Sequence, residues 1–260
     1  MHPAMQLNRL HLATRARRLT ALAILAAALT GCQSITGSQP FTQVRVIDVS
    51  PDAPNLDIYQ NASVGLYNIG FGTVSSYLEV APGATLHAAY TAGTQQQLAQ
   101  VRGTFLSGTQ YTVLTGNVAA NLQMTVLRDQ STPAPAGQVA LRFLGQATRA
   151  GAVDLYLAPP GSSLTGIAPI ASGLSFGGNT GYIGAPSGTY SIVAFPAGAA
   201  PSVATPVYTG SQAIYPGGSA RTLVLIDERA DPSTADRVTP RAAAAPALQI
   251  ISADDFDPAS

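Results

Sequence analysis

Two parts of this chain repeat each other, and this duplication constrains the fold more than any other feature of the sequence. Segments 44–46 and 56–59 match 141–143 and 153–156 at an offset of 97 residues. Tyr77 matches Tyr182 at an offset of 105, and 111–114 match 221–224 at an offset of 110. Growing offsets indicate short insertions in loops of the second copy. Because the period is far longer than a solenoid unit, the pattern predicts two copies of a small domain.

Apolar and polar residues alternate within each copy. Val44 and Val46 flank Arg45, and Leu141 and Phe143 flank Arg142. This period of two predicts β-strands, and turn sequences such as Pro-Gly and Ser-Gly separate the strand-like stretches. No sustained helical period follows the amino-terminal leader. We therefore expect an all-β protein with two tandem immunoglobulin-like antiparallel β-sandwiches.

The amino terminus has the pattern of a targeting signal. A basic stretch ends at Arg18, a short apolar run follows, and Leu29-Thr30-Gly31-Cys32 closes it. This ending resembles the lipobox of bacterial lipoproteins, which implies cleavage before Cys32 and a lipid on its thiol. Gln33, rather than Asp, follows the cysteine, which by the same resemblance favours the outer membrane. We expect a membrane anchor at Cys32.

Composition divides the chain into parts with different roles. The predicted divisions are a signal peptide (1–31), a lipidated tether (32–40), the first β-sandwich (41–130), the second β-sandwich (138–229) and a C-terminal tail (230–260). Residues 131–137 are rich in Ser, Pro and Ala, as linkers are. The acidic residues 254–257 are interpreted as part of a solvated tail.

Charge excludes one class of partner. From Cys32 onward the chain has nine Arg, no Lys and thirteen acidic residues, which makes it mildly acidic. It has no basic patch with interleaved aromatic residues, so we expect no nucleic-acid binding.

The opening of the first repeat resembles a known family. Residues 44–54, followed by Leu56-Asp57-Ile58-Tyr59, are similar to the start of the bacterial domain of unknown function 4397. The resemblance extends over 41–229 and implies secreted or surface-attached β-sandwich modules, often in tandem. Asp48 stands where that family commonly has a histidine. The family implies no chemistry.

The loop from Ser50 to Pro54 has two interpretations. Its prolines restrict the backbone, while Ser50 and Asp52 are able to bond nearby amides, so a tight structural crossover is favoured. Ser50 and Asp52 remain candidates for ligand contact because loops carry function. The spacing of Arg45 and Asp57 recurs in Arg142 and Asp154, and it predicts a cross-strand ion pair in each copy if the two strands are neighbours.

One motif has the form of a catalytic turn. Gly173-Leu174-Ser175-Phe176-Gly177 fits the G-x-S-x-G pattern of hydrolases. His87 is the single histidine after Cys32, and it precedes the serine, contrary to the hydrolase order. We interpret His87 as a partly exposed strand residue. We expect no catalytic residues, no metal site and no cofactor.

These patterns leave two hypotheses for function. The first is a non-enzymatic binding, adhesion or structural module in the cell envelope, with an envelope protein or glycan as a possible partner. The alternative is an envelope hydrolase with an unidentified site.

Overall fold

The computed structural model describes residues 41–228 and 247–258. The predicted signal peptide, Cys32 and the tether lie outside these residues. Within the described ranges, no helix has the length and apolar character needed to cross a membrane.

Strands make up nearly all of the regular structure, together with one short 3₁₀ helix, η1 (Ala119–Asn121). The strands of the first repeat are β1 (Thr42–Asp48), β2 (Leu56–Gln60), β3 (Ser63–Ile69), β4 (Leu78–Val80), β5 (Gly83–Thr91), β6 (Gln97–Phe105), β7 (Gln110–Gly116) and β8 (Gln123–Arg128). Those of the second are β9 (Gln138–Gly145), β10 (Val153–Ala158), β11 (Ala171–Leu174), β12 (Asn179–Pro186), β13 (Gly188–Pro196), β14 (Tyr208–Thr209), β15 (Ala213–Tyr215), β16 (Ala220–Asp227) and β17 (Leu248–Phe256).

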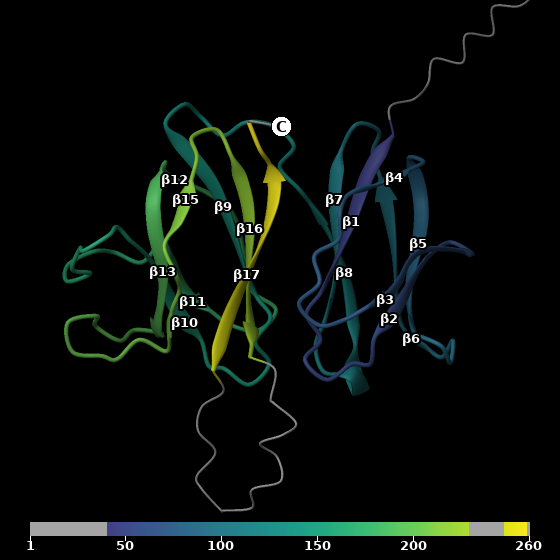
Figure 1. Cartoon of the computed structure of the whole chain (residues 1–260), viewed down its shortest axis with the longest axis horizontal. Coiled ribbons are helices and arrows are strands. Elements are labelled where there is room, and N and C mark those ends of the chain that lie inside the picture. The colour runs from purple at the N-terminus through teal and green to yellow at the C-terminus, as the bar shows by residue number, and fades with distance from the viewer. Residues whose placement is uncertain (1–40, 229–246, 259–260) are drawn as a thin grey trace, which may run out of the picture. The chain divides into compact units, whose positions relative to one another are not determined.

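Each repeat is a sandwich of two sheets (Figure 1). In the first repeat the sheet orders are β4-β1-β7-β8 and β3-β2-β5-β6. In the second they are β12-β9-β16-β17 and β11-β10-β13-β14, with β15 also pairing with β13. The prediction of an all-β protein built of tandem sandwiches is confirmed. All pairs are antiparallel except β1–β7 and β9–β16, the equivalent pairs in the two repeats.

The alternation seen in the sequence directs apolar side chains into each sandwich. Val44 and Val46 on β1 belong to the core of the first repeat, whereas Leu141 and Phe143 on β9 belong to that of the second. Both cores contain only residues of their own repeat. Each sandwich therefore has its own hydrophobic core.

The opposite faces of these strands are buried as well. Ile47 from β1, Leu144 from β9 and Val224 from β16 belong to a third apolar cluster, which joins the two repeats. We call the surface between the sheets β4-β1-β7-β8 and β12-β9-β16-β17 the junction. Burial on both faces explains why β1 and β9 are almost continuously inaccessible to solvent.

Part of the predicted C-terminal tail is a strand. β17 pairs with β16 from Ala220–Phe256 to Asp227–Leu248 and completes the junction sheet of the second repeat. The prediction of a solvated tail is wrong for these residues, since Ala253 and Asp255 are 3% exposed. The physical reason is that β16 would otherwise leave an unpaired edge.

The connection between the repeats is tied to the second sandwich. The Ala134 amide donates to the Gly218 carbonyl at 2.9 Å, and the Ala134 side chain is buried against Ala140 and Ala220. The linker composition is thus compatible with a fixed path, because proline restricts the backbone without needing hydrogen bonds.

Candidate binding cleft at the junction of the repeats

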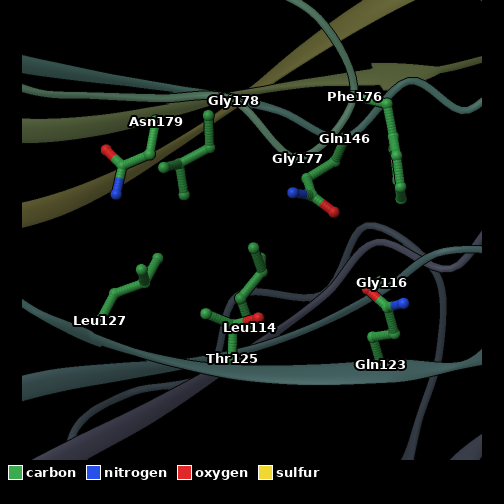
Figure 2. A pocket seen from close by; sticks show the side chains of 11 residues that line it. Leu114, Gly116, Gln123, Thr125, Leu127, Gln146, Phe176, Gly177, Gly178 and Asn179 are labelled. Carbon is green, nitrogen blue, oxygen red and sulfur yellow. The ribbon is translucent and has the colours of Figure 1, made fainter.

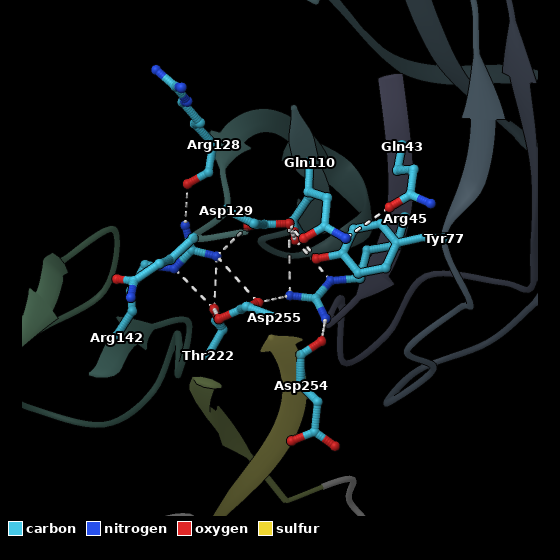
Figure 3. A network of polar contacts seen from close by, with 12 residues as sticks. Gln43, Arg45, Tyr77, Gln110, Arg128, Asp129, Arg142, Thr222, Asp254 and Asp255 are labelled. Atoms are coloured by element: carbon cyan, nitrogen blue, oxygen red, sulfur yellow. Dashed lines mark hydrogen bonds and ion pairs between the residues drawn. The ribbon is translucent and has the colours of Figure 1, made fainter. Parts of the chain in front are cut away.

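Two arginines and two aspartates form reciprocal ion pairs across the junction (Figure 3). Arg45 of the first repeat donates from Nη2 to Asp255 of the second. Arg142 of the second repeat donates to Asp129 of the first at 2.5 Å. The four side chains are at most 3% exposed. Each repeat therefore supplies an arginine to the carboxylate of the other, as in a two-fold symmetric interface.

Hydroxyl groups complete this arrangement in the same reciprocal way. Each arginine Nε donates to a threonine of its own repeat at 2.9 Å, and each threonine and tyrosine hydroxyl donates to the aspartate of its own repeat at 2.7–2.8 Å. Each guanidinium also lies 4.8 Å from the centre of a tyrosine ring. We call these residues the junction network: Arg45, Tyr77, Thr112 and Asp129 with Arg142, Tyr182, Thr222 and Asp255.

Burial makes the charges of the junction network interdependent. Burial alone lowers the pKa of Arg45, but the carboxylates of Asp255 and Asp129 outweigh it, so the net shift is upward. Burial also raises the pKa of the Tyr77 hydroxyl, which keeps it protonated as a donor. Two positive and two negative charges balance, and the removal of any one leaves a buried charge without its partner.

The predicted ion pairs within each repeat are wrong. Arg45 lies on β1 and Asp57 on β2, which belong to different sheets. The Asp57 carboxylate instead accepts a hydrogen bond from the Asn68 amide at 2.8 Å. Asp154 likewise accepts from the backbone amides of Gly173 and Gly198. The Arg–Asp spacing is equal in the two repeats because the domain is duplicated. In each repeat the arginine and the aspartate lie on strands that are not neighbours in a sheet.

The loop from Ser50 to Pro54, which contains the candidate ligand residues, is held in place by burial and hydrogen bonds. Ser50 is fully buried, and Asp52 accepts a hydrogen bond from the Ala119 amide at 2.8 Å, which fixes η1. Behind the loop, Asp48 is 1% exposed and accepts from the Ser50 amide. Burial raises the pKa of the Asp48 carboxyl to about 7. The hydroxyls of Ser50 and Thr115 are buried nearby without a hydrogen-bond partner among the described residues.

The structure places Ser175 of the hydrolase-like motif and His87, the single histidine after Cys32, in different repeats. His87 is 3% exposed on β5 in the first repeat, with its ring 5.2 Å from that of Phe105, so its interpretation as a partly exposed residue is wrong. Burial lowers the pKa of His87 to about 4. Ser175 lies in the turn between β11 and β12 of the second repeat, and the turn joins two strands rather than a strand and a helix.

A cleft of about 320 Å³ opens at one side of the junction (Figure 2). We call it the junction cleft; it is lined by Leu114, Gly116, Gln123, Thr125 and Leu127 of the first repeat and Leu144, Gln146, Phe176, Gly177, Gly178 and Asn179 of the second. Figure 2 shows the two sets facing each other across the cavity. Phe176, the aromatic residue of the G-x-S-x-G turn, is 40% exposed. The volume of the junction cleft is typical of small-molecule sites.

The other half of the junction shows what would fill this space. Strand registers and equivalent backbone hydrogen bonds relate cleft residues to residues of the opposite repeat. Four pairs place a small or amide residue in the cleft where the other repeat has an apolar one: Gly116 with Ile226, Thr125 with Ile251, Gln146 with Val49, and Asn179 with Val74. Leu127 with Ala253 differs in the opposite sense. The four apolar members all pack in the junction cluster. We call them the closed half; the cleft exists because small and amide residues replace them on the other side.

The absence of a side chain at Gly116 leaves space for the Gln146 side chain. A Cβ atom at Gly116 would lie 2.5 Å from the Gln146 Oε1. Glycine at this position therefore leaves room for the Gln146 side-chain amide, and Leu114, Leu127 and Leu144 are among the apolar residues that line the same cleft. Sequence reasoning missed this site because it depends on side-chain volume at equivalent positions.

The polar side chains of the cleft are neutral and are able to form hydrogen bonds with a ligand. These side chains are three amides and one hydroxyl. Across residues 41–228 and 247–258, no group of three His, Cys, Asp or Glu side chains is placed to hold a metal ion. The arrangement suits non-covalent binding.

The fold and the junction place this chain in the class of proteins with two β-sandwich repeats, which are joined here through a buried polar interface. Residues 42–156 match the family model described as Domain of unknown function (DUF4397), which confirms the resemblance seen in the sequence over these residues. The match runs from β1 into β10 and includes Arg45, Asp129 and Arg142. A search of curated proteins found no match.

Proposed function

We propose that this protein is a cell-envelope lipoprotein, anchored to the outer membrane through Cys32, whose paired repeats form a non-enzymatic binding module. The observation that carries the proposal is the junction cleft, whose equivalent in the same molecule is filled with apolar side chains. A gap in one half of a duplicated interface is a specific feature, since protein interiors otherwise pack densely.

The anchor part of the proposal rests on Leu29-Thr30-Gly31-Cys32 after the apolar leader. Lipid on Cys32 would hold the module at a membrane surface through the segment before Phe41. The intact mass of protein extracted from membranes tests this: a mature chain beginning at Cys32 with added acyl mass is expected, and a different start without acyl mass contradicts it.

Binding is preferred over the alternative, an envelope hydrolase, because no acid–base pair accompanies the cleft. Ser175 and His87 belong to different sandwiches, and His87 is buried in a core. A hydrolytic site would need a base within hydrogen-bond reach of its nucleophile.

Closing the cleft is expected to abolish binding while leaving the fold intact. The double variant Thr125→Ile with Gln146→Val copies two of the four residues of the closed half, Ile251 and Val49, which pack together with the junction cluster. Full-length wild-type protein incubated with envelope extract should retain a ligand that the double variant loses.

Tyr67→Ala is the matched control, because Tyr67 is 72% exposed and lies outside the cleft lining. It should retain the ligand as the wild type does. Equal retention by all three proteins, or no retained ligand in any, would contradict a binding role for the cleft.

A further inference from the structure

The lining of the junction cleft excludes charged ligands as the preferred class. Its residues include no Asp, Glu, Arg, Lys or His. A charged group entering the cleft would lose water without gaining an opposite charge. The ligand is therefore expected to be neutral.

Two amides are available to such a ligand. Neither Gln123 nor Gln146 makes a side-chain hydrogen bond to another described residue, and both line the cleft. Each amide has two N–H donors and one carbonyl acceptor. Groups that both donate and accept, above all hydroxyls, match this pattern from opposite walls of the cleft.

The backbone amides of Gly177 and Gly178, in the turn that lines one wall of the cleft, are already engaged. The Gly177 amide donates to the Gly145 carbonyl at 2.8 Å, and the Gly178 amide donates to the Ser175 carbonyl at 2.9 Å. A peptide that binds as an added strand needs a row of free backbone donors and acceptors. The side-chain amides instead favour a compact ligand with polar groups around its rim.

An apolar surface accompanies these amides. Leu114, Leu127 and Leu144 form part of the lining, as does the aromatic residue Phe176, which is 40% exposed. A pyranose ring combines hydroxyls at its edge with a face of C–H groups that packs against apolar and aromatic surfaces. We propose that the junction cleft binds a neutral saccharide, with Gln123 and Gln146 contacting its hydroxyls and Phe176 its apolar face; this rests on the binding role proposed above.

Isothermal titration calorimetry of the full-length protein with neutral sugars tests this assignment. The probes are glucose, galactose, N-acetylglucosamine and their β-linked disaccharides. At least one is expected to bind, with affinity about tenfold weaker for Phe176→Ala and for Gln146→Val, since each removes one contact of ordinary strength. Ser175→Ala should bind as the wild type does, because Ser175 does not line the cleft.

The outcomes separate this assignment from the binding role itself. If no neutral saccharide binds the wild type, or if binding is unchanged in both Phe176→Ala and Gln146→Val, the saccharide assignment is wrong. If an envelope-derived peptide or an anionic compound then binds and the cleft-closing variant Thr125→Ile with Gln146→Val abolishes it, the binding role stands and only the ligand class fails. Failure of every ligand at the cleft overturns both.

Discussion

Replacing Arg45 with methionine is expected to lower the free energy of unfolding by about 3–5 kcal/mol, because the change leaves buried carboxylates without a partner. Arg45 donates to Asp255, to Thr112 and to the Asp254 carbonyl. After its loss, Asp129 and Asp255 would share Arg142, which is 4.0 Å from the Asp255 carboxylate. Burial raises the pKa of Asp255, so its charge depends on these donors.

Arg221→Met is the matched control in urea unfolding. Its guanidinium pairs with Asp254 at 2.7 Å, next to Asp255 on β17, but these side chains are 22% and 59% exposed. Exposed pairs contribute about 0–1 kcal/mol. The same loss of stability in Arg45→Met and Arg221→Met would show that the junction network is energetically no different from a surface pair.

The second large effect concerns the pH dependence of stability in the first repeat. The pKa of Asp48 is raised to about 7 in the folded state, from 3.8, so folding favours its protonated form. Its contribution is therefore present at low pH and is lost as pH rises through about 7. The pKa of His87 is lowered to about 4, from 6.5, so its contribution is present at higher pH and is lost as pH falls toward 4. Between these limits the two groups act in opposite directions.

Single substitutions should separate the two effects. Relative to the wild type, Asp48→Asn is expected to gain about 2–4 kcal/mol of stability between about pH 4 and about pH 8, as the wild-type carboxyl becomes charged. His87→Gln is expected to gain about 2–3 kcal/mol relative to the wild type as pH falls from about 7 to about 4.

Urea unfolding over this pH range measures both difference profiles. Because each variant is compared with the wild type at the same pH, the titration of other groups cancels to first order. A difference profile for Asp48→Asn that is flat with pH would contradict a buried, neutral Asp48.

The duplicated sandwich architecture could be predicted from the sequence because it rests on local patterns. Alternation around Arg45 and Arg142 identified strands, and the matched Tyr77 and Tyr182 identified equivalent positions. The alternation of apolar and polar residues could not show which surface packs against the polar face of a strand. Arg45 and Arg142 were correctly placed opposite the apolar face, but that face is covered by the other repeat.

The end of the second repeat was missed for a related reason. β17 is separated from β16 by residues 228–247, and its sequence, with Asp254 and Asp255 adjacent, resembles an acidic tail. The equivalence of Asp129 and Asp255 becomes visible only once β8 and β17 are seen to occupy the same place in their sheets. The junction cleft depends in turn on this equivalence, since Thr125 must be compared with Ile251.

The central structural claim is that the two repeats form one cooperative unit through the junction. Contacts group the described residues 41–228 and 247–258 into a single compact unit, and both the third apolar cluster and the junction network include residues of both repeats. Differential scanning calorimetry of the wild-type protein tests this most directly. One transition is expected, with calorimetric and van't Hoff enthalpies in agreement. Two resolved transitions, each with the enthalpy of a single sandwich, would contradict the claim.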